Sequence, residues 1–436
     1  MRSRIMKNLY DELKKYSPIE NIQNLVGLFL IYYFISPIFS FHNQFVFFFF
    51  VLCWFILALK NDYIVVTRAV KSKVFIFLCL FPIISIIYCF IGNSLLNKHV
   101  LLIPFMYLFA KVNSSEKYEK ILNIYILFTL IYILFICAFT LIKLEGNPEL
   151  TRLLARGDKD VIKHFVSPFT ATYATVYTVM MIGIANFYYA MVQKQKIIRF
   201  LGIAFTLFIC YFLFKSAYSI SILIYIIGIS IILLQICYVK AHNKKKFMIS
   251  FLILSIIILA VYLLFHDVIA DCILLLGNYT KDIMQQRRIR EIAELVRNFG
   301  IETEGGMINR LKLYGVSLET FFNKPIFGVG FREELLSTTA NVSTPMIGNH
   351  STILDMLASF GIFGFFYIFS IPIYYYDLKN KIAKHIKGVY ILLGLFIFLS
   401  LINTTHNINF YFVMLFYIPN IFFILERNGD SRRNRQ

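Results

Sequence analysis

The 436-residue sequence predicts an all-α, polytopic membrane helix bundle of about twelve transmembrane helices, with one large external helical loop between spans nine and ten. Hydrophobic residues make up 59% of the chain and charged residues only 15%, whereas soluble domains carry about 25% charged residues. The charges gather between apolar runs of the length needed to cross a bilayer core of roughly 30 Å. Because a backbone in lipid must satisfy its own hydrogen bonds, each run is expected to be helical.

The apolar runs expected to span the membrane cover residues 25–39, 45–58, 74–91, 100–110, 121–142, 171–191, 198–214, 220–238, 248–265, 352–376, 388–402 and 410–424. The fourth run is short, and a tilted, re-entrant or interfacial segment is its alternative. The runs divide the chain into three regions. These are a nine-span amino-terminal membrane region (1–265), an external (periplasmic) loop with amphipathic helices (266–350) and a three-span carboxy-terminal membrane region (351–436).

The distribution of Lys and Arg predicts the orientation of the bundle. With the amino terminus inside, both termini and every second loop are rich in basic residues, and nearly all of the net charge of +19 lies on the cytoplasmic side. The basic composition therefore reflects topology and indicates no nucleic-acid partner. A polar segment precedes the first apolar run and no small-residue cleavage site follows that run, so no cleaved signal peptide is expected. Of the seven cysteines only Cys272 lies outside a predicted span, and without a CxxC spacing no metal site is expected.

The long external loop carries its own helical patterns. Residues 283–298 alternate apolar and Arg positions as an amphipathic helix does, and such a helix is suited to the membrane surface. Residues 308–322 form a second expected helix, and the stretch NKPIFGVGF at 323–331 is expected to be a tight turn because of its Pro and Gly residues. Long loops held by a rigid scaffold often carry function.

Two ionisable residues mark the point where the chain re-enters the membrane. His350 lies at the outer mouth of the tenth span, where a histidine has a pKa suited to acid–base chemistry near neutral pH. Asp355 lies inside that span, and an ionisable group within a span suggests function. The alternative is structural: Asp355 pairs with a neighbouring helix, and His350 is an ordinary interfacial histidine.

Basic side chains on the predicted outer side suggest an anionic ligand. Arg152 and Arg156 lie in the loop after the fifth span, Lys215 precedes the eighth span and Arg310 lies on the second loop helix. Guanidinium groups suit phosphate and pyrophosphate because their donors form a fixed fork. The alternative is that each is a solvated loop charge. No Walker, GxGxxG, HExxH or GxSxG motif is present, so any energy for a reaction has to come with the substrate or from a gradient.

The order of motifs from 310 to 364 resembles the core of the O-antigen polymerase and O-antigen ligase superfamily. Its members carry an Arg, a short helix, an nPxxGxG turn, and a loop that ends in His before xxxLxxxxxxGxxG. The matching residues here are Arg310, Pro325, Gly328, Gly330, His350, Leu354, Gly361 and Gly364. The family often has Ser-Arg at the start of span eight, whereas this chain has FKSAYS, so that Ser216 lacks its Arg and Lys215 supplies the nearest positive charge.

The resemblance implies a metal-independent, inverting glycosyltransferase without cofactors, in the bacterial cytoplasmic (inner) membrane, with both termini cytoplasmic and the active site periplasmic. The donor would be an oligosaccharide on undecaprenyl pyrophosphate, and the further partners would be the lipid bilayer, a chain-length regulator and a flippase. His350 and Arg310 would be catalytic, with Asp355 and Ser216 in support. The implied pyrophosphate-binding residues are Arg152, Arg156 and Lys215.

Three functions remain open at this point. A polymerase joins repeat units into surface polysaccharide, either O-antigen or capsule, and the Ile-, Phe- and Lys-rich composition favours this reading. A ligase instead transfers the finished glycan to lipid A–core through the same type of site. A lipid-linked sugar flippase or other transporter has a similar number of spans, but such transporters tend to show internal repeats and intramembrane charges, which are not evident here.

Overall fold

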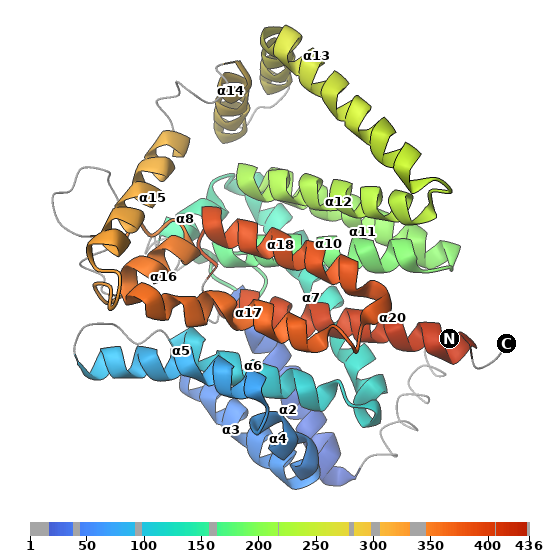
Figure 1. Cartoon of the computed structure of the whole chain (residues 1–436), viewed down its shortest axis with the longest axis vertical. Coiled ribbons are helices and arrows are strands. Elements are labelled where there is room, and N and C mark those ends of the chain that lie inside the picture. The colour runs from blue at the N-terminus through green and yellow to red at the C-terminus, as the bar shows by residue number, and fades with distance from the viewer. Residues whose placement is uncertain are drawn as a thin grey trace.

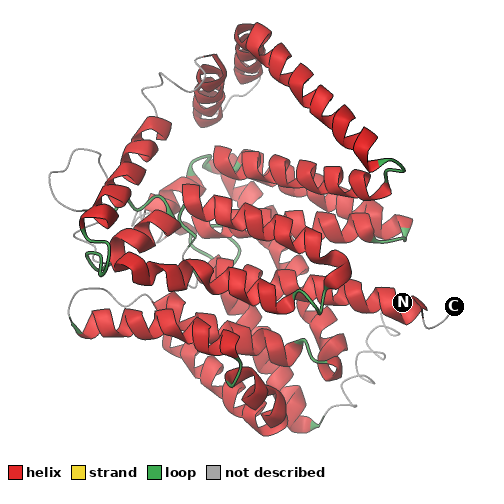
Figure 2. Cartoon of the chain, in the orientation of Figure 1, coloured by secondary structure: helices red, strands yellow, loops and turns green. Residues whose placement is uncertain are grey.

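A computed structural model describes residues 17–37, 44–91, 98–156, 164–216, 218–278, 283–297, 306–331, 346–405 and 407–433. Within these ranges the chain is helical and contains no β-strand (Figure 2). The helices of the first half are α2 (Pro18–Ile35), α3 (Gln44–Asn61), α4 (Tyr63–Val70), α5 (Lys73–Phe90), α6 (Lys98–Asn113), η2 (Glu116–Tyr118), α7 (Glu119–Gly146), α8 (Leu150–Arg156) and α10 (Tyr173–Val192). Those of the second half are α11 (Lys196–Lys215), α12 (Ser219–Lys240), α13 (Lys244–Asn278), α14 (Ile283–Arg297), α15 (Gly306–Asn323), α16 (Thr352–Phe360), η4 (Gly361–Phe363), α17 (Gly364–Leu378), η5 (Ala383–His385), α18 (Ile386–Ile402), α19 (Ile408–Phe412), η6 (Val413–Tyr417) and α20 (Ile418–Arg433).

All twelve predicted spans fall on helices, and the all-helical prediction is confirmed. Among the described residues, eight helices are long and apolar enough to cross a membrane, or up to ten if each of two bent pairs counts as one span. The fourth predicted span coincides with a shorter apolar helix, α6. The count of twelve therefore stays a prediction, and it depends on how the short and bent helices sit in the bilayer.

Helices α10 and α20 form the centre of the bundle. In the apolar 18-residue stretch of α10, 83% of the residues are buried, and in that of Ile408–Arg427 94% are buried. In the corresponding stretches of α5 and α11 only 22% are buried. Figure 1 shows the long helices running side by side around this centre, with α15 and α16 at one end of the bundle. Because lipid is as apolar as the side chains it meets, the peripheral helices expose Phe, Ile and Leu at no cost. The central helices are therefore the ones that position side chains.

A helix continues from the ninth predicted span into the expected loop. Helix α13 bends near Phe265, the predicted end of the ninth span, and continues to Asn278. Helices α14 and α15 coincide with the two predicted loop helices. Figure 1 shows α13 diverging from its neighbour α12, and apolar side chains along its first half are exposed. Residues 332–345 of the predicted loop, which include the polar stretch at 337–344, lie outside the described residues.

The tenth predicted span is broken at Gly361, where α16 ends and η4 begins. The turn after α15 docks against this break through backbone hydrogen bonds. The Gly330 N–H donates to the Ser359 carbonyl (2.8 Å), and the Ile362 N–H donates to the Pro325 carbonyl (2.8 Å). A break in a membrane helix leaves backbone groups unpaired, so the turn supplies the partners that the helix has lost.

Close backbone contact explains the glycines of this motif. Gly328 and Gly361 have φ angles of 65° and 56°, which L side chains rarely adopt. A Cβ atom on Gly328 would lie 2.5 Å from the Ser359 carbonyl oxygen, and one on Gly361 would lie 2.5 Å from the Ile326 carbonyl oxygen. The spacing of Gly residues in the motif is therefore a packing pattern that fixes α15 against α16.

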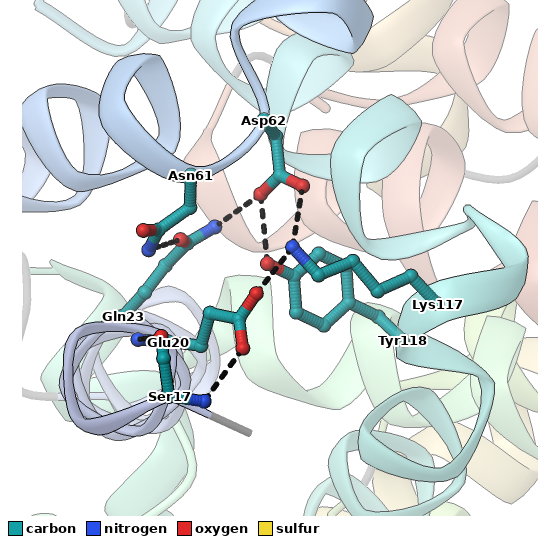
Figure 3. Close-up of polar contacts among 7 residues, drawn as sticks. All are labelled: Ser17, Glu20, Gln23, Asn61, Asp62, Lys117 and Tyr118. Carbon is teal, nitrogen blue, oxygen red and sulfur yellow. Dashed lines mark hydrogen bonds and ion pairs between the residues drawn. The ribbon is translucent and has the colours of Figure 1, made fainter. Parts of the chain in front are cut away.

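A buried polar cluster joins helices at the opposite end of the bundle (Figure 3). Asp62, at the 111° corner between α3 and α4, is only 7% exposed. Its carboxylate accepts hydrogen bonds from Gln23 Nε2 (3.1 Å) and the Tyr118 hydroxyl (2.8 Å), and it pairs with Lys117 Nζ (3.2 Å). Lys117 also pairs with Glu20 (2.5 Å). These contacts tie α2, the α3–α4 corner and η2 together.

Candidate functional site

His350 is held in one tautomer by the backbone before it. Asn349 adopts a φ of 53°, a left-handed conformation that Asn tolerates better than most residues. His350 Nδ1 lies 2.6 Å from the Asn349 carbonyl oxygen. Because a carbonyl oxygen only accepts, Nδ1 carries the proton in the neutral ring, and Nε2 keeps its lone pair. Burial lowers the pKa of His350, the hydrogen bond to Asn349 opposes this shift, and the Arg310 charge adds to it.

Asp355 organises the loop that carries His350. Its side chain is 2% exposed, and its carboxylate accepts hydrogen bonds from Ser317 Oγ on α15 (2.6 Å) and from the Ser351 N–H (3.1 Å). Ser317 Oγ in turn accepts from the Gly348 N–H (2.8 Å). The structural alternative that the sequence left open for Asp355, pairing with a neighbouring helix, matches these contacts. Asp355 therefore holds in place the backbone segment that carries His350.

Arg310 lies among tyrosines at the same end of the bundle. It lies near the start of α15, is partly exposed, and acts electrostatically on His350. Its charge also acts on Tyr173 and Tyr177 of α10 and on Tyr314 of its own helix. Burial raises the pKa of Tyr314 and Arg310 opposes that rise. Arg310 and His350, 40 positions apart in sequence, therefore lie within electrostatic range of each other.

A third group of predicted residues lies at the carboxy-terminal end of α11. Lys215 is the last residue of this helix and is half-buried. Ser216 is fully buried, and its hydroxyl donates to the Phe212 carbonyl (2.8 Å), so it is committed to the helix end. The Thr151 hydroxyl donates to the Ser216 carbonyl (3.4 Å), which places α8 beside this end. Arg152 and Arg156 lie on α8, but their side chains lie outside the described part of the chain.

Aromatic rings connect the two groups. The Tyr218 hydroxyl donates to the Thr151 carbonyl of α8 (2.9 Å). The Tyr218 ring lies 5.4 Å from that of Tyr173 and 5.9 Å from that of Tyr177, measured between centroids. The Tyr173 hydroxyl also donates to Asn403 Oδ1, after the end of α18. The same end of the bundle thus holds the residues that we call the His350 cluster, namely Tyr173, Tyr177, Tyr218, Arg310, Tyr314, His350 and Asn403.

No sequence motif predicts a role for the tyrosines or for Asn403. Tyr173 and Tyr177 are spaced four apart at the start of a predicted span, a pattern equally typical of core packing. Asn403 follows the eleventh span and matches no motif. A cavity of about 410 Å³ lies elsewhere, between α13 and α14, and none of its lining residues belongs to the cluster. No three His, Cys, Asp or Glu side chains in the described ranges are grouped so as to hold a metal ion.

Comparison with known proteins places this region in a family. Residues 203–369, from α11 into α17, match the family model described as O-antigen ligase. No curated protein and no solved structure matches the chain. The matched segment contains Lys215, Arg310 and His350, whereas Tyr173 and Asn403 lie outside it. The match confirms the resemblance of this chain to the O-antigen polymerase and O-antigen ligase superfamily.

Proposed function

We propose that the protein polymerises oligosaccharide repeat units linked to undecaprenyl pyrophosphate into surface polysaccharide. The observation that carries this proposal is that the Arg310 cation lies within electrostatic range of His350, whose Nδ1 contacts the Asn349 carbonyl so that Nε2 keeps its lone pair. One residue suits the acceptance of a proton and the other suits the stabilisation of negative charge. The family match to an enzyme class that handles lipid-linked glycans supports the same reading.

In the proposed reaction the acceptor sugar hydroxyl gives its proton to His350 Nε2 as its oxygen attacks the anomeric carbon of the donor. The bond from that carbon to the pyrophosphate oxygen breaks, and undecaprenyl pyrophosphate leaves with the electron pair. Arg310 receives the developing charge, with Lys215 and the Arg152 and Arg156 side chains of α8 as further cations. Direct displacement inverts the anomeric centre. The sugar–pyrophosphate bond carries its own activation, so no nucleotide is needed.

The orientation of the bundle follows from the same proposal. The end that carries the His350 cluster faces the periplasm of the bacterial inner membrane, and the end with the Asp62 cluster and both termini faces the cytoplasm. The distribution of Lys and Arg supports this orientation. The lipid bilayer then delivers the polyprenyl donor sideways to the cluster. A flippase that supplies the donor and a regulator of chain length are the partners that this reaction requires.

Transfer of finished glycan to lipid A–core is the second candidate, because the matching family model bears the description O-antigen ligase. Deletion of the gene followed by gel analysis of surface glycan separates the candidates. Loss of a polymerase leaves core with a single repeat unit, and loss of a ligase leaves core without any repeat unit. Repeat units that stay on the cytoplasmic side would identify a flippase and contradict both. Unchanged long-chain glycan after deletion would exclude all three functions.

A further inference from the structure

The side-chain amide of Asn403 has a buried N–H donor that makes no hydrogen bond of normal geometry within the described residues. Its side chain is 4% exposed and follows the last residue of α18. Its Oδ1 accepts hydrogen bonds from the Tyr173 hydroxyl and from the Thr404 N–H (3.1 Å). Because an N–H group only donates, the atom that faces Thr404 is the oxygen, which fixes the orientation of the amide. The other atom, Nδ2, makes no hydrogen bond of normal geometry among the described residues, although the amide lies near enough to the Tyr177 hydroxyl to interact with it.

An unpaired buried amide is costly. Leaving such a donor unsatisfied lowers stability, and buried polar groups in native proteins normally find protein, water or ligand partners. Other side chains of the bundle also have unpaired buried atoms, for example Asn420 Oδ1. Asn420 lies on α20, and its Nδ2 donates to the Phe416 carbonyl (2.8 Å) in the same helix. Asn403 differs because its neighbours are residues of the His350 cluster.

The backbone around Asn403 is joined directly to the segment that carries His350. The Asn403 carbonyl accepts from the Thr352 N–H (3.1 Å), two residues after His350. The Tyr314 hydroxyl donates to the Ile402 carbonyl (2.6 Å), so α15 and its Arg310 lie against the same helix end. These contacts fix Asn403 relative to the groups assigned to proton transfer and to the pyrophosphate.

We propose that Asn403 and Tyr173 form a glycan-binding subsite in which Asn403 Nδ2 donates a hydrogen bond to a sugar oxygen. The Tyr173 ring, which is partly exposed, supplies an apolar face for the same sugar. A neutral amide suits a neutral hydroxyl or ring oxygen, whereas the pyrophosphate has Arg310 and Lys215. This inference rests on the proposed glycosyl transfer.

The test measures binding of a purified lipid-linked oligosaccharide to detergent-solubilised protein, in a His350→Ala background where no turnover occurs. Asn403→Asp keeps the acceptor for Tyr173 and Thr404 but removes the donor, and Asn403→Ala removes both. We expect each to weaken binding about tenfold, with Asn420→Ala unchanged as the matched control. Tyr173→Phe should bind more tightly than Tyr173→Ala, because it keeps the ring. Thermal unfolding of each variant identifies any that is misfolded.

Two results separate this inference from the proposed function. If the unsubstituted protein transfers glycan but Asn403→Asp and Asn403→Ala bind it as tightly as the His350→Ala background, the subsite is refuted and the function stands. If the protein binds the lipid-linked glycan through Asn403 but joins no repeat units, the function is refuted and the subsite stands. A variant with normal affinity for undecaprenyl pyrophosphate alone, but weaker affinity for the glycan-bearing lipid, supports the assignment to sugar. The reverse pattern contradicts it.

Discussion

At the scale of single residues, the state of His350 determines how activity depends on pH. Burial and the Arg310 charge lower the pKa of His350 from its ordinary value of 6.5, so the ring is neutral at pH 7. A general base works only when neutral. Activity should therefore be full above this pKa and fall as the pH drops through it, with a midpoint below 6.5. The rate of glycan transfer by purified protein, followed against pH, measures this, and a midpoint above 6.5 contradicts it.

Arg310 is expected to act through its shape as well as its charge. Arg310→Lys keeps the positive charge but replaces the fork of donors with a point charge, so two pyrophosphate oxygens cannot both be held. We expect kcat to fall by roughly 10²-fold, as when one transition-state donor is lost. Lys312→Arg, an exposed position on the same helix, serves as the control and should leave the rate unchanged. Equal rates for Arg310→Lys and the unsubstituted protein would exclude a bidentate role.

At the scale of elements, the docking of the α15 turn against the break between α16 and η4 holds the site together. Gly361→Ala places a Cβ atom against the Ile326 carbonyl at a left-handed φ, and we expect a loss of about 1–3 kcal/mol in stability. Gly315 lies on the exposed surface of α15, where an added Cβ atom would meet no neighbouring atom within 4 Å, so Gly315→Ala should not lower stability. Thermal unfolding in detergent compares the two. A Gly361→Ala variant as stable as Gly315→Ala would show that the contact is dispensable.

The corner between α3 and α4 depends on Asp62. Asp62→Ala removes the acceptor that Gln23 and the Tyr118 hydroxyl share, and it removes one ion-pair partner of Lys117. The loss of this acceptor for buried donors should lower the free energy of unfolding by about 1–3 kcal/mol. Glu116→Ala, an exposed neighbour of Lys117, is the control. The unfolding temperature should fall for Asp62→Ala alone, and because this cluster is remote from His350, the affinity for lipid-linked glycan should stay the same.

The helices could be predicted from the sequence, but some of the contacts between them could not. Apolar runs predict helices because a lipid-embedded backbone has no other way to pair, and the amphipathic patterns of α14 and α15 were equally legible. The break at Gly361 could not be predicted, because a continuous helix and a broken one have the same apolar pattern. The pairing of Arg310 with His350 followed from a motif. The contribution of Tyr173 and Asn403 depends on contacts across more than 200 positions, which no local pattern records.

At the scale of the whole molecule, the orientation of the bundle is open to a direct test. Cys272 lies on α13 beyond its bend, is exposed, and is the one cysteine outside the predicted spans. A membrane-impermeant thiol reagent should label it from the periplasmic side of intact cells, and Cys272→Ser should remove the label. Labelling that requires permeabilised cells would invert the assignment and place the His350 cluster in the cytoplasm.

The central claim is that the His350 cluster joins lipid-linked glycans without an external energy source. The most direct measurement follows purified protein in sealed liposomes, with a lipid-linked oligosaccharide and no ion gradient or nucleotide. We expect the unsubstituted protein to produce longer lipid-linked glycans, and a folded His350→Ala variant to produce none. Longer glycans from His350→Ala at an undiminished rate, or product only when a gradient is imposed, would contradict the claim.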